Sequence, residues 1–231
     1  MRSSSAWILL AALAPASLPA QEAYKVEAIK TAPPASISPE IGAVLQPGGY
    51  RVLDDQGKPF AELWLRKSIP AASQPAGPKG VIQFPFLQES ELLGVMNLLG
   101  EAHDYRDQAI AKGVYTMRYG LQPVNGDHLG VSPFRDYVLL LPADKDKAVG
   151  ALPRKQLETQ SSESAGSSHP AVFFMLAAPT TGGGSPVPAM IRDEEKNTWR
   201  VLVPLDLAVK GEAKSVPYPV TIILVGASEG A

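Results

Sequence analysis

"GVYTMRYGLQP", residues 113–123, is the stretch that decides the fold class. Large apolar side chains occupy every second position of it: Tyr115, Met117, Tyr119 and Leu121. The positions between them hold Val114, Thr116, Arg118 and Gly120. In a β-strand, successive side chains point to opposite faces of the sheet, so a period of two residues predicts a strand with one buried face.

The segments on both sides of this stretch also have strand patterns. Residues 136–143 and 171–179 are short apolar runs, which are typical of buried strands. Residues 50–67 and 189–207 each hold two apolar runs around a polar turn, which predicts two β-hairpins. Further short strands are predicted over residues 24–30, 91–100 and 216–228.

Other segments do not have the strand pattern. Prolines in residues 31–40 favour an extended connection, and residues 68–80 form a loop rich in Pro, Gly, Ser and Ala. Only residues 145–163 have a helix-like composition. The chain is therefore predicted to be all-β, an antiparallel β-sandwich of about nine or ten strands with at most one short helix, in a single domain over residues 21–231.

The first twenty residues have the features of a secretory signal peptide. Arg2 precedes an apolar run from Ala6 to about Leu18, and small residues lead to a polar start at Gln21. The run spans about 20 Å as a helix, against roughly 30 Å for a bilayer core, so a permanent membrane anchor is not expected. Cleavage is expected after Ala20, with Ala16 as the alternative site. The mature protein should be periplasmic or secreted.

The composition excludes several classes of site. The 231 residues include no cysteine, which rules out disulfides, thiolate metal sites and a cysteine nucleophile. The formal net charge is −2 and no basic stripe occurs, which argues against nucleic-acid binding.

The segment 121–142 contains two side chains that are candidates for a functional site. It places Asp127 and His128 between Gly126 and Gly130, which predicts an ordered loop at one end of the sandwich. The chain has three histidines, and the other two, His103 and His169, also lie in predicted loops. Imidazoles can form a zinc or copper site, so the candidate metal ligands are His128, His169, His103 and Asp127. The alternative is that each histidine only holds its own loop in shape.

Aromatic residues give a third possibility, because aromatic rings on one face of a sandwich can stack on sugars. The candidate set is Trp64, Tyr105, Tyr115, Tyr119, Phe134 and Tyr137. Aromatic side chains with a period of two are more often part of the core.

Residues 104–146, "DYRDQAIAKGVYTMRYGLQPVNGDHLGVSPFRDYVLLLPADKD", and 167–172, "SSHPAV", carry a family resemblance. They resemble a family of uncharacterised secreted bacterial proteins that share the patterns G-V-Y-T-x-R-Y and G-D-H-L-G-V-S-P. The resemblance implies that Asp127, His128 and His169 belong to the family's motifs. It implies no activity, no catalytic residue and no substrate.

These observations predict a secreted, non-catalytic binding or interaction module without a cofactor, whose partner is a protein or a glycan. The alternatives are a periplasmic zinc- or copper-binding protein that uses the loop histidines, and a carbohydrate-binding module.

Overall fold

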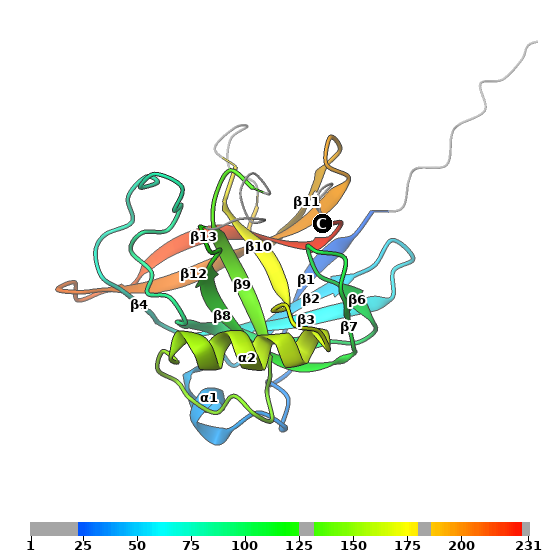
Figure 1. Ribbon diagram of the computed structural model, residues 1–231, viewed down its shortest axis with the longest axis horizontal. Coiled ribbons are helices and arrows are strands. Elements are labelled where there is room, and N and C mark those ends of the chain that lie inside the picture. Colours follow the sequence, from blue (N-terminus) through cyan, green and yellow to red (C-terminus); the bar gives the residue numbers. More distant parts are fainter. Residues whose placement is uncertain (1–22, 125–131, 180–185, 228–231) are drawn as a thin grey trace, which may run out of the picture.

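The computed structural model describes residues 23–124, 132–179 and 186–227, and strands dominate them (Figure 1). The all-β class is therefore confirmed. The elements follow in the order β1 (Lys25–Ile29), α1 (Pro39–Val44), β2 (Gly49–Leu53), β3 (Pro59–Leu65), β4 (Ile69–Ala71), β5 (Leu92–Leu98), β6 (Ala102–His103), β7 (Ala109–Ile110), β8 (Gly113–Leu121), β9 (Asp136–Pro142), α2 (Arg154–Ala165), β10 (Val172–Ala177), β11 (Ala189–Asp193), β12 (Thr198–Val209) and β13 (Val216–Val225).

The arrangement of the strands differs from the expected antiparallel sandwich. Within the described residues, eleven strands form one continuous sheet in the order β1-β2-β3-β5-β8-β9-β10-β13-β12-β11, with β4 attached to β12. Strand β4 pairs with β12 in parallel, so the sheet is mixed. The sequence did not predict this pairing because β4 lies in a segment expected to be a loop. Ile69 and Ala71 of this strand are buried in the core.

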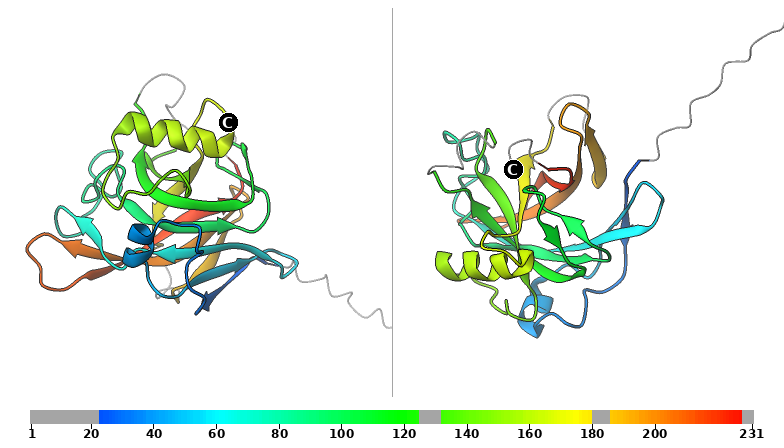
Figure 2. Two further views of the ribbon diagram at one scale, coloured as in Figure 1. Left: turned by 90° about the horizontal axis from the view of Figure 1, so that it is seen from below. Right: turned by 45° about the vertical axis from the view of Figure 1, so that its right-hand side comes forward.

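The long sheet curls until β1 contacts β11, as two views of the chain show (Figure 2). The rings of Tyr24 and Trp199 lie 5.5 Å apart and connect the two ends of the sheet. This curl gives the sheet an inner face, which encloses the core, and an outer face.

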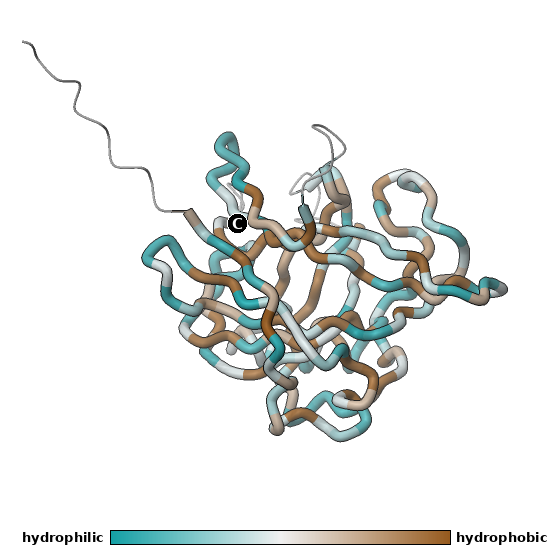
Figure 3. Tube along the Cα trace, turned by 180° about the vertical axis from the view of Figure 1, so that it is seen from behind, coloured by the Kyte–Doolittle hydropathy of each residue, from teal (hydrophilic) through white to brown (hydrophobic). Residues whose placement is uncertain are grey.

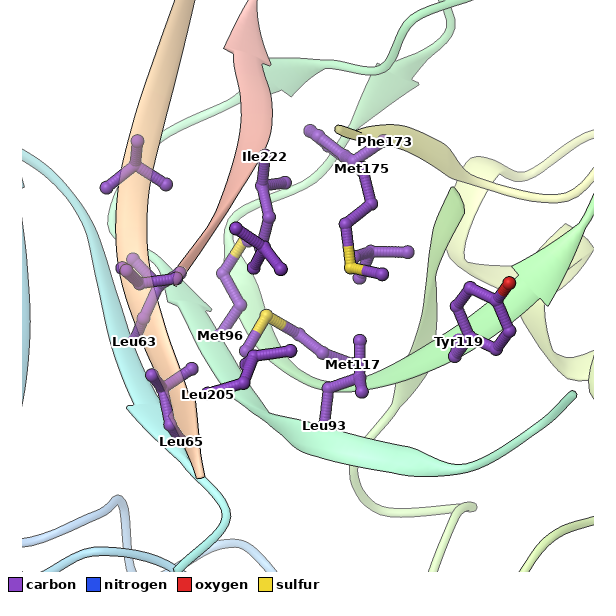
Figure 4. Close-up of a cluster of buried hydrophobic side chains, with 14 of the residues drawn as sticks. Leu63, Leu65, Leu93, Met96, Met117, Tyr119, Phe173, Met175, Leu205 and Ile222 are labelled. Carbon is purple, nitrogen blue, oxygen red and sulfur yellow. The ribbon is translucent and has the colours of Figure 1, made fainter. Parts of the chain in front are cut away.

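The inner face carries the main core. Side chains of β3, β5, β8, β10, β12 and β13 point toward one another there, and they include Met96, Met117 and Met175 (Figure 4). Flexible methionine side chains fill irregular space between the branched side chains of a curled sheet. Apolar residues gather along the strands, whereas hydrophilic residues gather at the outer turns (Figure 3).

Strand β8 follows the alternation that the sequence predicted. Tyr115, Met117 and Tyr119 lie in the inner core. Thr116 and Arg118, on the opposite face, are also fully buried. The outer face of the sheet is therefore covered at this strand.

The described residues contain two helices, one more than expected. Ser38 caps α1, because its hydroxyl accepts a hydrogen bond from the backbone N–H of Ile41 at 3.3 Å. Pro39 occupies the first turn, where a proline is tolerated because its missing N–H would have no partner in the helix. Pro39 therefore starts a helix where the sequence predicted an extended connection. No helix among the described residues is long and apolar enough to span a membrane.

The second helix, α2, begins nine residues later than the helix-like composition suggested, directly after Pro153. It ends at Gly166, whose φ of 58° is a left-handed conformation that glycine adopts without strain. Helix α2 lies across the outer face of the sheet, against β9 (Figure 1).

The two prolines in β13 lie at an edge of the sheet, as the sequence predicted. Residues 216–219 pair only with β12, whereas Val220–Ile222 pair with both β12 and β10. Pro217 and Pro219 thus lie in the part of the strand that has one neighbour, where a missing N–H costs little.

Close backbone contact at β5 leads to a stability prediction. A Cβ atom on Gly94 would lie 2.3 Å from the carbonyl oxygen of Trp64 on β3. We expect Gly94→Ala to lower the free energy of unfolding by at least about 2 kcal/mol, because the backbone cannot move away without breaking the pairing. Gly100→Ala is the control, since nothing lies within 4 Å of its new Cβ. Urea unfolding of both variants tests this, and equal stabilities would contradict it.

Candidate functional site

The histidines do not form a metal site within the described residues. His103 is exposed on β6, with its Nδ1 2.9 Å from Oδ1 of Asp107. His169 is exposed after α2, with its Nδ1 3.3 Å from the hydroxyl of Ser168. The described residues contain no group of three or more His, Asp or Glu side chains placed to hold a metal. Asp127, His128 and their flanking Gly126 and Gly130 lie outside the described residues.

Five of the six aromatic residues considered for sugar stacking are buried: Trp64, Tyr105, Tyr115, Tyr119 and Tyr137. The indole N–H of Trp64 donates to the carbonyl oxygen of Thr31 at 2.8 Å, and the Tyr119 hydroxyl donates to Asp136 at 2.6 Å. The sixth, Phe134, is half-buried. These side chains therefore do not present a flat exposed platform. Tyr105 and Tyr137, however, line a cavity on the outer face of the sheet.

A buried ion pair positions the segment that leads to this cavity. The guanidinium of Arg118 on β8 donates two hydrogen bonds to Asp146, from Nε at 2.6 Å and from Nη2 at 2.9 Å. Its remaining N–H groups donate to the carbonyl oxygens of Ser90, Gly150 and Ala148. All five donors of the guanidinium are therefore used. This one side chain ties the segment 146–150 and the turn at Ser90 to the sheet.

Helix α2 follows that segment and is fixed again at its other end. The Ser161 hydroxyl accepts a hydrogen bond from the backbone N–H of Ala171 at 3.0 Å, just before β10. The backbone N–H of Leu152 donates to the Ser90 hydroxyl at 2.8 Å. Between these anchors, Leu157 is buried against the outer face of β9 and β10. The helix is thus held by polar contacts at both ends and by one large apolar side chain.

The cavity lies between α2, the outer face of β9 and β10, and the segments around residues 105 and 169. Its volume is about 270 Å³. Most of its lining residues are apolar or aromatic. The lining consists of Glu89, Tyr105, Arg106, Leu121, Gln122, Pro123, Tyr137, Leu139, Leu157, Glu158, Ser162, Ser168, His169, Pro170, Val172 and Phe174.

Three aromatic rings line one part of the cavity. Phe174 makes edge-to-face contacts with Tyr105, at 4.3 Å between ring centroids, and with Tyr137, at 4.5 Å. Burial raises the pKa of Tyr137 well above its ordinary value, although the positive charges of Arg106 and Arg135 act against this shift. The Tyr137 hydroxyl is therefore neutral over the physiological range and able to donate a hydrogen bond.

The charged groups of the cavity differ in how they are paired. Glu89 and Glu158 both face Arg154, at 3.7 Å and 2.8 Å from its guanidinium nitrogens. The half-buried guanidinium of Arg106 has no hydrogen-bond or ion-pair partner within residues 23–124, 132–179 and 186–227. Arg106 is therefore a cation of the cavity wall that is free to bind a ligand.

Asp104 fixes the turn that carries Tyr105 and Arg106. This buried carboxylate accepts four hydrogen bonds: from the backbone N–H groups of Arg106, Gln108 and Val172, at 2.9 to 3.0 Å, and from the Gln108 side-chain amide at 2.8 Å. It therefore joins the β6–β7 hairpin to the start of β10.

Comparisons with protein-family models, curated proteins and solved structures found no match to this chain.

The sequence pointed to Tyr105, Tyr137 and His169, but not to the residues of α2 that line the other side of the cavity. One signal was present: both faces of residues 136–142 and 172–176 are apolar, so the outer face of these strands needs a cover. Nothing in the sequence indicated that the cover would be α2, because this helix carries few apolar residues.

The role of Asp104 can be tested by a change of one atom. In Asp104→Asn, an NH₂ group replaces one acceptor oxygen and faces backbone donors. We expect the free energy of unfolding to fall by about 2 kcal/mol and the amides of residues 102–110 to exchange faster with solvent. Asp107→Asn is the control, because Asp107 is exposed and asparagine tolerates its φ of 60°. If the two variants behave alike in hydrogen-exchange mass spectrometry, Asp104 does not fix this turn.

Proposed function

We propose that the protein is a secreted, non-catalytic binding module whose ligand site is the cavity beneath α2. The observation that carries the proposal is a cavity with apolar and aromatic walls and a few polar groups at its edge. Sites for small organic ligands have this composition, because apolar walls supply affinity and a few polar groups supply orientation. The volume of about 270 Å³ suits a small molecule.

The walls come from three separate parts of the chain, which favours a formed site over a gap in the packing. Leu157 lies on the helix side, Leu139 and Phe174 lie on the sheet side, and Tyr105 lies on the β6–β7 turn. The parts outside the sheet are held by polar anchors: Asp146 for the segment before α2, Ser161 for the helix, and Asp104 for the turn. A site built in this way keeps its shape when the ligand is absent.

The signal peptide expected at residues 1–20 supports a role outside the cytoplasm. The ligand would then come from the periplasm or the medium.

Binding of a neutral apolar dye tests the proposal. N-phenyl-1-naphthylamine fluoresces in apolar surroundings, and we expect one molecule to bind per chain with a Kd of roughly 1–100 µM. Ser162 lines the cavity from α2, so Ser162→Trp should fill the cavity and weaken dye binding at least roughly tenfold.

Gln156→Trp is the matched control, because Gln156 lies on the same helix and is exposed. It should bind the dye like the parent protein. Absence of dye binding by the parent, or equal weakening by the two tryptophan variants, would refute the site.

A further inference from the structure

We infer that the ligand of the cavity beneath α2 is a small carboxylic acid with an apolar body, and that Arg106 and the Tyr137 hydroxyl bind its carboxylate. This inference rests on the proposed function and specifies the chemistry of the ligand.

Tyr137 provides the first observation. Only 6% of the residue is exposed, and it lines the cavity. Its hydroxyl makes no hydrogen bond to any other residue of the part of the chain that the structure describes. The hydroxyl is not one of the fully buried polar atoms that lack a partner, so it is open to the space of the cavity. A ligand atom that accepts a hydrogen bond would satisfy it.

Arg106 provides the second observation. Arg106 lines the same cavity, and its positive charge acts on the Tyr137 hydroxyl. The planar guanidinium presents donors that match a carboxylate. The two groups together offer a cation and a neutral donor to one ligand group, and this combination suits an anion with two oxygens.

The acidic groups of the lining do not cancel this preference. Glu89 and Glu158 share Arg154 as their counterion. Among the groups that act on the Tyr137 hydroxyl, Arg106 and Arg135 are cations and Tyr105 is another tyrosine. The polar end of the ligand therefore lies beside two cations.

The apolar walls define the rest of the ligand. Leu139, Leu157 and Phe174 enclose the remaining space, and they offer no charged group. An apolar body of the size of a phenylalkyl group fits a volume of about 270 Å³. The ligand class is therefore a monocarboxylate with a short aliphatic or arylalkyl chain.

Three probes that share a phenylalkyl chain but differ in the terminal group test the inference. They are 4-phenylbutyrate (a carboxylate), 4-phenylbutan-1-ol (an alcohol) and 4-phenylbutylamine (an amine). Each is titrated into the parent protein carrying N-phenyl-1-naphthylamine, and displacement of the dye is measured at neutral pH. The carboxylate should bind at least roughly tenfold more tightly than the alcohol, because its hydrogen bonds are assisted by charge. The amine should bind most weakly.

Arg106→Gln should remove most of the preference for the carboxylate over the alcohol and leave the affinity for the alcohol unchanged. Tyr137→Phe keeps the ring and should weaken only the carboxylate, by roughly threefold to tenfold. Lys58→Gln is the control, since it removes one exposed positive charge at the β2–β3 turn, away from the residues that line the cavity. It should preserve the preference.

Equal binding of acid and alcohol, tighter binding of the amine, or failure of all three probes to displace a bound dye would overturn the inference. In each of these cases the dye alone still binds the parent protein, so the proposed function would stand. Loss of dye binding itself is the separate result that refutes the function.

Discussion

The buried ion pair between Arg118 and Asp146 is the interaction on which the candidate site depends. Both side chains are fully removed from solvent, and the guanidinium uses all five donors. Burial of two charges is expensive, so such a pair is retained only with complete hydrogen bonding. Here it connects a central strand to the segment that precedes α2.

Helix α2 needs such anchors because its own sequence gives it little reason to lie on the sheet. Of its twelve residues, the buried ones are Leu157, Ser161 and Ser164. A surface helix is usually held by a continuous apolar stripe, whereas this helix is held by Asp146 before it and by Ser161 near its end. With few apolar side chains to fill the space beneath it, the helix leaves a cavity above the apolar outer face of β9 and β10.

Much of the fold was predictable because strand periodicity is a local property. The alternation in residues 113–121 predicted both the strand and its inner face, and two hairpins were recognised from their turns. The pairing of β4 with β12 joins residues far apart in the sequence, so no local pattern could predict it. Arg118 was placed on the correct face, but periodicity does not tell what covers that face. For the same reason Tyr137 was named without its neighbour Arg106, and the histidines were grouped by residue type instead of by position.

A substitution that removes the ion pair but keeps the size of the side chain tests this account most directly. In Asp146→Asn, Arg118 stays buried without a full counterion, and Asp144→Asn changes an exposed carboxylate in the same segment as a control. Hydrogen-exchange mass spectrometry then compares α2 with the central strands. The account predicts that the amides of residues 154–165 lose protection in Asp146→Asn while β3, β5 and β12 keep theirs, and that Asp144→Asn matches the parent. Unchanged protection of α2, or an equal loss in every strand, would contradict it.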